Sequence, residues 1–369
     1  MIGLLTYHAA YNYGSVLQAY ATQEILRMIT NDVQIINYRM KEQKRFYSLY
    51  RAYFGYKCFL KDLMQFPVHA KRKRRAKLFE DFITNKMNLS IECENYEEIS
   101  AIWNQYECIV SGSDQIWNKH SHELEHSDWT YMRPYLLDGY HGRKISYASS
   151  IGNMNEEELG RILSSIKNFN VISMREISSS KRVGERIGKD IQWVLDPTFL
   201  LTSEEWIKRF NLCKCEDNYI LYYSLQGIKP LKRISVLLRK KAKENNCKLK
   251  IITPFAYLYL DDDIIEMHPE MGPIEFLNAI YNAKMVVTNS YHGTILSVNF
   301  GKEVYSLCEN TGSEFRKTDI LCELGMANRI IFNSNTLLKS FTPVDYNKVE
   351  NILCKLRENS IHYLKKNIK

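Results

Sequence analysis

A short polar turn, residues 289–292 (NSYH), lies between two apolar segments and carries side chains that could bind an anion and move a proton. Residues 285–288 are typical of a buried strand, and residues 294–300 predict a short helix. The first backbone N–H groups of a helix have no partner within it, and the helix dipole is positive there, so this turn suits an anionic ligand. His292 could transfer a proton near neutral pH. The alternative is a plain helix cap by Ser290, with His292 as an ordinary turn residue.

The elements around this turn predict a parallel sheet. A second apolar strand at residues 304–307 follows the helix at once, which makes a strand–helix–strand unit. Similar alternation runs through the whole chain, so we expect an α/β fold with parallel sheets and helices on both faces. A chain of 369 residues is too long for one ordinary core and predicts two domains, with a boundary near residues 214–217.

The first strand–loop–helix unit places a polar loop at the carboxyl end of residues 2–7, the edge where ligands bind in open α/β sheets. Gly14 would let the backbone approach a ligand closely. A second polar segment, residues 111–118 (SGSDQIWN), follows another buried strand and combines an aromatic ring, amides and a carboxylate that suit a sugar. An ordinary Asp-containing turn is the alternative. The candidates for binding a sugar at these two segments are Asn12, Tyr13, Gly14, Gln18, Ser113, Gln115 and Trp117.

Arg175 follows a predicted strand, and its fork of donors could clamp a carboxylate or phosphate. An ion pair with Glu176 or Asp196 is the alternative. The basic run at residues 71–75 predicts the solvated face of a helix, and contact with an anionic membrane surface is the second interpretation.

Composition excludes several classes of function. The net charge of +8 is too small and too dispersed to indicate nucleic-acid binding. The nine cysteines show no metal-type spacing, and the sequence has neither a signal peptide nor an apolar segment that could cross a bilayer. His120, His122 and His126 have ligand-like spacing, but we interpret them as an exposed loop, so no metal site is predicted. These features predict a cytoplasmic protein with reduced thiols, acting in the cytoplasm or at the inner face of the membrane.

Five segments together resemble the polysaccharide pyruvyl transferase family. The segments occur in one order from residue 2 to about residue 330: TYHAAYNYGSVLQAYA with VQIINYR, then IVSGSDQIWN, SMRE, VLDPTFLL and VVTNSYHGTILSVNFGK. The resemblance implies a GT-B-like fold of two Rossmann-like domains facing a cleft. We expect an amino-terminal acceptor domain at residues 1–213, a carboxyl-terminal donor domain at 214–345, and a final helix at 346–369 that crosses back to the first domain.

The resemblance also implies an activity. Members transfer the enolpyruvyl group of phosphoenolpyruvate to sugar hydroxyls and form a pyruvate ketal on capsular or other exopolysaccharide. The donor is a substrate, so no cofactor and no metal are expected, and the acceptor is a sugar or a lipid-linked oligosaccharide. The expected catalytic residues are His292, as general acid, and Asp114, as the group that accepts a hydroxyl proton.

The donor site implied by the resemblance departs from the family at one position. Several members carry an arginine two residues before the histidine, where this chain has Ser290, so another cation must supply the charge, and Arg316 is the candidate. Arg175 matches a donor-binding arginine of the family. The donor-binding candidates are Arg175, Asn289, Ser290, Tyr291, Gly293, Thr294 and Arg316. A GT-B glycosyltransferase that uses a nucleotide sugar is the alternative function, and an inactive scaffold of a glycan-assembly complex is a third.

Overall fold

The computed structural model describes residues 1–49, 63, 66–121, 128–254, 260–309, 314–339 and 342–368. The chain forms two compact units, each described here by itself. Unit 1 comprises Met1–Ser48, Asp81–Leu201 and Ile352–Lys369, and unit 2 comprises Leu49–Glu80 and Thr202–Asn351. This division differs from the expected boundary at residue 213, because residues 49–80 and the helix that begins at Ser203 group with unit 2.

Unit 1 is built on short parallel strands, and the two at the centre of its main sheet (Ile2–Leu5 and Cys108–Ser111) are buried along their whole length, as expected where helices cover both faces of a sheet. Four of them have the order β2-β1-β3-β4, and isolated bridges from Ile145 to Val171 and from Ser149 to Met174 join the pair β5-β6 to β4. The strands are β1 (Ile2–Leu5), β2 (Val33–Ile35), β3 (Cys108–Ser111), β4 (Arg143–Ser146), β5 (Ser173–Met174) and β6 (Gln192–Trp193). The helices are α1 (Tyr13–Ile29), α2 (Lys41–Tyr47), α5 (Tyr96–Ala101), α6 (Glu156–Lys167), α7 (Ile177–Ile187) and α8 (Pro197–Leu200).

Unit 2 contains a six-stranded parallel sheet with the order β12-β11-β10-β7-β8-β9. The central strands β7 and β10 are buried along their whole length. The strands are β7 (Tyr219–Tyr223), β8 (Lys248–Ile252), β9 (Ile265–Met267), β10 (Met285–Thr288), β11 (Glu303–Leu307) and β12 (Ile330–Ile331). The helices are α9 (Ser203–Phe210), α10 (Ile228–Glu244), α11 (Pro273–Asn282), α12 (Tyr291–Asn299) and α13 (Phe315–Glu323).

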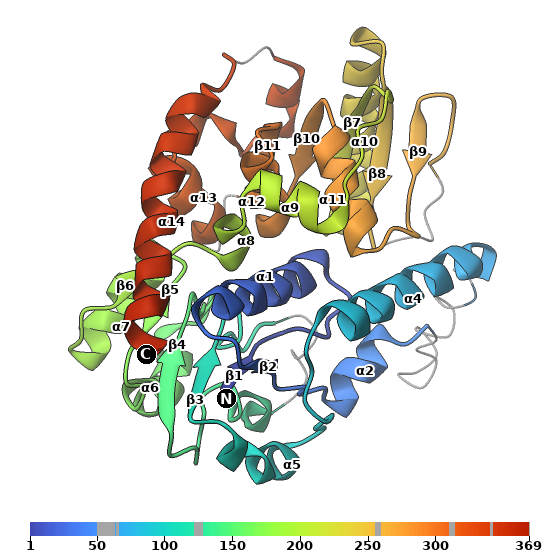
Figure 1. Ribbon diagram of the computed structural model, residues 1–369. Coiled ribbons are helices and arrows are strands. Elements are labelled where there is room, and N and C mark those ends of the chain that lie inside the picture. The colour runs from blue at the N-terminus through green and yellow to red at the C-terminus, as the bar shows by residue number, and fades with distance from the viewer. Residues whose placement is uncertain are drawn as a thin grey trace. The chain divides into compact units, whose positions relative to one another are not determined.

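Each sheet contains one topological switch point. In unit 2 the chain leaves β7 for β8 and β9 on one side and returns to β10 and β11 on the other. In unit 1 the chain leaves β1 for β2 on one side and places β3 on the other (Figure 1). Loops that follow the two strands at a switch point diverge to opposite faces of the sheet, so the carboxyl edge between them is where ligands bind in open α/β sheets. The polar segments singled out in the sequence lie at these two edges.

Two long helices run across the boundary between the units along the chain: α4 (His69–Lys86) and α14 (Tyr346–Ile368). The part of α14 that belongs to unit 1 is fastened to backbone at the carboxyl ends of the strands. Ser360 Oγ accepts from Leu195 N (3.0 Å), and Tyr363 Oη donates to Ser146 O (2.9 Å). None of the described helices combines the length and the apolar character that crossing a bilayer requires.

Candidate functional site

The turn after β10 begins α12 directly. Ser290 is the N-cap of α12, and its hydroxyl accepts a hydrogen bond from Gly293 N (3.2 Å). The helix therefore starts three residues earlier than the sequence predicts and places His292 in its first turn, at the switch point of unit 2. His292 is 7% exposed and meets the ring of Tyr291 edge-on, with 5.1 Å between ring centroids. The imidazole of His292 thus lies at the positive end of the α12 dipole.

Gly293 has a packing reason to be glycine. A Cβ built on Gly293 would lie 2.8 Å from Thr288 Oγ1 and 2.9 Å from Tyr223 Cδ1, closer than real Cβ contacts. The start of α12 therefore approaches β7 and β10 with no room for a side chain. Thr294 is buried next to it and donates to Ser290 O (2.9 Å) while sharing a hydrogen bond with Ser306 Oγ (3.0 Å). Thr294 stabilises the turn, because its hydroxyl bonds to other groups of the protein rather than pointing to a ligand.

Asn289 joins the turn to the loop after β7, because its Oδ1 accepts from Leu225 N (2.8 Å). That loop ends at Gly227, the N-cap of the 17-residue helix α10. A Cβ on Gly227 would meet no atom within 4 Å, so this backbone borders open space. Two helix amino ends, those of α10 and α12, therefore follow the two strands of one switch point. This is the arrangement in which backbone N–H groups receive phosphate or carboxylate oxygens.

Lys317 is a cation bound to the turn, a role for which the sequence had suggested Arg316. The ammonium of Lys317 donates to Asn289 O (3.0 Å) and Leu307 O (2.6 Å), at the carboxyl ends of β10 and β11. It is 3% exposed and forms an ion pair with Glu314 Oε2 at 2.6 Å. Arg316 is half-buried in the first turn of α13.

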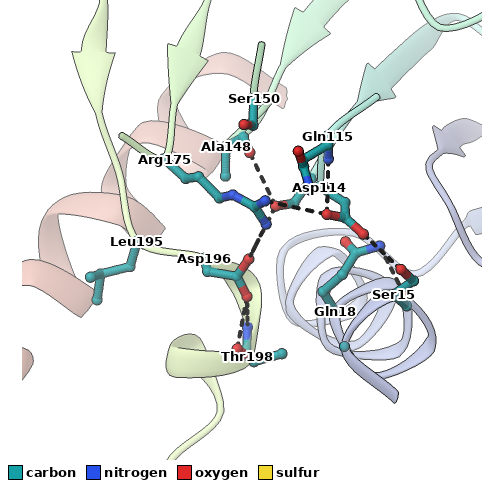
Figure 2. A network of polar contacts seen from close by, with 12 residues as sticks. Ser15, Gln18, Asp114, Gln115, Ala148, Ser150, Arg175, Leu195, Asp196 and Thr198 are labelled. Carbon is teal, nitrogen blue, oxygen red and sulfur yellow. Dashed lines mark hydrogen bonds and ion pairs between the residues drawn. The ribbon is translucent and has the colours of Figure 1, made fainter. Parts of the chain in front are cut away.

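At the switch point of unit 1, Arg175 lies at the centre of a buried ion-pair cluster (Figure 2). Its side chain is 0% exposed. Its nitrogens contact Asp196 Oδ2 at 3.0 Å, Glu176 Oε1 at 3.1 Å and Asp114 Oδ1 at 3.3 Å. A donor could reach this guanidinium only by displacing a carboxylate. The geometry thus favours the ion-pair alternative, in which Arg175 positions acidic side chains, over direct donor binding.

The cluster holds the ends of four elements together. Asp114, after β3, accepts from Ser15 Oγ of α1 at 2.8 Å. Asp196, after β6, caps α8 by accepting from Thr198 N (3.0 Å) and Thr198 Oγ1 (2.7 Å). One guanidinium faces three carboxylates, so the cluster carries more negative than positive charge, and removing the arginine would leave those charges buried without their counter-ion.

Most of the predicted acceptor residues are structural. Trp117 is 0% exposed, donates from Nε1 to Tyr135 O (3.1 Å) and meets Phe169 edge-on, so it belongs to the core and offers no face to a sugar. Gln18 is buried and donates to Thr6 Oγ1 (2.8 Å) and Ser15 O (2.9 Å), which fastens α1 to the end of β1.

The remaining acceptor candidates divide by exposure. Ser113, Tyr13 and Gly14 are buried, and the hydroxyl of Ser113 donates to Ala148 O (3.1 Å). Asn12 and Gln115 are partly exposed. Asn12 caps α1 by accepting from Gly14 N (3.0 Å), while Gln115 Oε1 accepts from Asn118 Nδ2 (2.7 Å). The surface that a ligand could touch at this edge is therefore smaller than the motif suggests.

Comparison with protein families identifies the chain. The model of the family described as polysaccharide pyruvyl transferase matches residues 12–307, which is more than half of the chain and includes the switch point of unit 2. The chain belongs to the polysaccharide pyruvyl transferase family. The resemblance noted in the sequence is thereby confirmed, and the protein is a transferase. A comparison with curated proteins finds no significant match.

Solved structures similar to this member of the pyruvyl transferase family have the GT-B type of fold. UDP-GlcNAc 2-epimerase from Neisseria meningitidis, bound to UDP-GlcNAc, matches over 100% of both chains with a TM-score of 0.57 and 12% identity. The UDP-GlcNAc 2-epimerase from Methanocaldococcus jannaschii matches over 97% of this chain and 91% of its own, with a TM-score of 0.50 and 15% identity. At such identities the similarity shows the fold alone, and it confirms the predicted GT-B-like α/β class.

Other predicted features fall outside these two edges. In the part of the chain that the structure describes, no group of three or more His, Cys, Asp or Glu side chains is placed to hold a metal ion. His122 and His126 lie outside the described residues, and His120 is exposed and pairs with Glu158 at 2.9 Å. The acidic cluster at residues 261–263 is used locally, because Asp262 caps its own loop and pairs with Arg239, and these bonds lower the pKa of Asp262 to about 2.

Sequence reasoning missed three members of these sites. It named Glu176 and Asp196 only as alternative partners of Arg175, although both acidic residues lie just beyond neighbouring strands of unit 1, which was the available signal. It missed Lys317 because nothing local marks that lysine. Its ammonium reaches the turn from α13, a helix that packs against α12 and β12.

Proposed function

We propose that the protein transfers the enolpyruvyl group of phosphoenolpyruvate to sugar hydroxyls and forms a pyruvate ketal during the synthesis of a cell-surface polysaccharide. The observation that carries this proposal is the placement of His292 in the first turn of α12, at a switch point within the region matched by the family. A carboxylate and a phosphate are the groups that the amino ends of α10 and α12 suit.

The proposed reaction has three steps. His292 gives a proton to the methylene carbon of the donor, and the adjacent carbon becomes cation-like. One sugar hydroxyl attacks this carbon and loses its proton to a base. The oxygen of a second sugar hydroxyl then bonds to the same carbon as the C–O bond to phosphate breaks, and its proton passes to the leaving phosphate, which closes the ketal.

We propose that Lys317 supplies the positive charge that Ser290 lacks. The ammonium already contacts the carbonyl of Asn289 and is balanced by Glu314, which is partly exposed. An anionic donor at the α12 amino end could replace Glu314 as the counter-ion of Lys317. The proposal predicts opposite effects at the two residues: Lys317→Met weakens binding of phosphoenolpyruvate, whereas Glu314→Gln strengthens it. A purely structural ion pair would make both variants neutral or harmful for binding.

On unit 1, we propose that Asp114 accepts the hydroxyl proton and that Arg175 and Ser15 hold its carboxylate in place. Asp114 is 6% exposed, and its two oxygens are fixed from different directions by Arg175 and Ser15. The partly exposed Asn12 and Gln115 flank it and suit the hydroxyl groups of a sugar or of a lipid-linked oligosaccharide.

The direct experiment incubates the protein with phosphoenolpyruvate and a panel of saccharide acceptors. Phosphate release is followed together with the ketal methyl signal in NMR spectra. The proposal predicts acceptor-dependent release, and a loss of about a hundredfold or more in turnover for His292→Gln with little change in donor affinity. Near-normal turnover in that variant would remove His292 from the mechanism.

The second candidate is an enzyme that acts on a nucleotide sugar. The observation that favours it is the similarity in fold to the epimerase bound to UDP-GlcNAc, together with serine at position 290. A helix amino end accepts a diphosphate as readily as a carboxylate. The two candidates differ in which ligand raises the melting temperature of the protein, phosphoenolpyruvate or UDP-GlcNAc. If neither does, the inactive scaffold becomes the better interpretation.

A further inference from the structure

The start of α4 presents an exposed stripe that is apolar at one end and basic at the other. Phe66, in a short turn of 3₁₀ helix (Phe66–Val68) before α4, is 69% exposed, and Leu63 is 62% exposed. Lys73, Arg74 and Lys77 of α4 are exposed as well. Lys73 and Lys77 are four residues apart within α4, which places these two lysines on one helical face. These five residues are called the α4 surface below.

The opposite side of the same segment is buried. Val68 is 5% exposed and Phe79 is 0% exposed, so this face packs into the protein and the α4 surface must face outward. Exposure of two large apolar side chains within three residues of one another costs free energy unless a partner covers them. The α4 surface is therefore the place where an external apolar phase would be favourable.

The charge of the segment has one sign. Between residues 63 and 79 there are six lysines and arginines and no aspartate or glutamate. Acidic residues from elsewhere in unit 2 lie near some of the basic residues: Lys71 lies 3.7 Å from Glu270, and Arg74 lies 3.9 Å from Glu275. Both distances are long for an ion pair, and the side chains of Lys71 and Arg74 are 41% and 61% exposed, so these pairs hold the two cations weakly.

We propose that the α4 surface docks the protein on a membrane that contains anionic lipids. The basic residues would contact lipid phosphates, and Phe66 and Leu63 would enter the boundary between headgroups and acyl chains. A lipid surface is the partner that combines dense negative charge with an apolar phase directly behind it. Nucleic acid would match the charge of the surface but would leave the aliphatic Leu63 without a partner.

Helix α10 offers a matched control in the same unit. It carries exposed cations at Lys229 and Arg233, spaced like Lys73 and Lys77, and one exposed apolar side chain, Val236, at 69%. It differs from the α4 surface in having a single small apolar side chain and no exposed aromatic ring. If membrane binding depended on charge alone, substitutions in α4 and in α10 would lower it equally. If the protein docks through the α4 surface, only the substitutions in α4 would lower it.

The test is flotation of the purified full-length protein with vesicles of phosphatidylcholine alone or with about a third phosphatidylglycerol. We expect binding only to the anionic vesicles. Each basic residue near such a surface contributes about fivefold in partition, so Lys73→Gln/Lys77→Gln should lower binding about 25-fold. Phe66→Ser should lower it as well, without changing the charge. The control variants are the double substitution Lys229→Gln/Arg233→Gln and the single substitution Val236→Ser. Both should bind the vesicles like the unmodified protein.

The proposal would be overturned if the protein bound neutral and anionic vesicles equally. It would also be overturned if the α10 and α4 variants lost vesicle binding to the same extent. The third contrary outcome is that the protein binds no vesicles but binds a single-stranded oligonucleotide through α4. The melting temperature of each variant shows whether it is folded. If the α4 double variant fails to fold, Phe66→Ser and the salt dependence of the unmodified protein still decide the question. Vesicle binding needs no donor, so the result is independent of the proposed transferase reaction.

Discussion

Replacing Arg175 with methionine should lower the stability of unit 1 strongly, and it should change the affinity for the donor far less. The substitution keeps much of the side-chain volume, but it removes the positive charge that the buried side chains of Asp114, Glu176 and Asp196 surround. Removing one partner of a buried ion pair costs about 3–5 kcal/mol, because the remaining charge is uncompensated. For a domain of this size, 1 kcal/mol corresponds to about 2–4 °C, so the melting temperature should fall by about 6–20 °C.

Thermal and urea unfolding of the full chain measure this effect. Arg182→Met is the matched control, because Arg182 lies on α7 of the same unit and pairs with Glu156 at the surface, where the expected cost is below about 1 kcal/mol. Adding Asp196→Asn to Arg175→Met should recover part of the loss, since one of the uncompensated charges is removed. A melting temperature close to that of the unmodified protein, combined with weaker binding of phosphoenolpyruvate, would refute the positioning role and restore direct donor binding.

Three further predictions concern residues whose surroundings fix the outcome. Gly293→Ala should cost about 1–3 kcal/mol in urea unfolding, because its Cβ would press on Thr288 and Tyr223, and a neutral result would show that the α12 start is loosely packed. Trp117→Ala should cost about 3–5 kcal/mol, as expected for a core aromatic, whereas normal stability with a raised acceptor KM would restore it as a sugar platform. Burial, aided by a nearby lysine, lowers the pKa of Lys302 from 10.5 to about 8. The unfolded chain therefore binds more protons between these pH values, and stability due to Lys302 rises with pH across that window. Lys302→Met should stabilise the protein at pH 7 by on the order of 1 kcal/mol, given the partial exposure of the ammonium, and the gain should fade as the pH rises from 8 to 10.5. If the gain in stability of Lys302→Met does not change with pH, the lowered pKa of Lys302 is contradicted.

The architecture could be predicted from the sequence because its signals are local. Alternating apolar strands and amphipathic helices predict a parallel sheet, and the strand at residues 285–288 corresponds to β10. The helix after it begins earlier than predicted, because Ser290 caps it without the glutamate that usually marks a capping box. The strand β9 was not predicted, because its three residues lack a periodic pattern and take their conformation from pairing with β8.

The site was less predictable, because it depends on which side chains meet in space. Polar residues at a strand end either face a ligand or bind each other, and the residue types are the same in both cases. At the unit 1 edge the second outcome prevails: Ser113, Gln18 and Arg175 donate hydrogen bonds to backbone carbonyls, to a hydroxyl and to carboxylates. The buried Trp117 illustrates the same ambiguity for an aromatic ring. Lys317 shows the reverse, a cation brought to a turn by a helix 25 residues further along the chain.

The central claim is that the start of α12 binds phosphoenolpyruvate, and calorimetric titration tests it most directly. The unmodified protein is titrated with phosphoenolpyruvate and, separately, with UDP-GlcNAc, and the first titration is repeated with Lys317→Met and Glu314→Gln. We predict saturable binding of phosphoenolpyruvate, weakened about tenfold or more in the lysine variant and strengthened in the glutamate variant. Saturable binding of UDP-GlcNAc with no heat from phosphoenolpyruvate would contradict the claim.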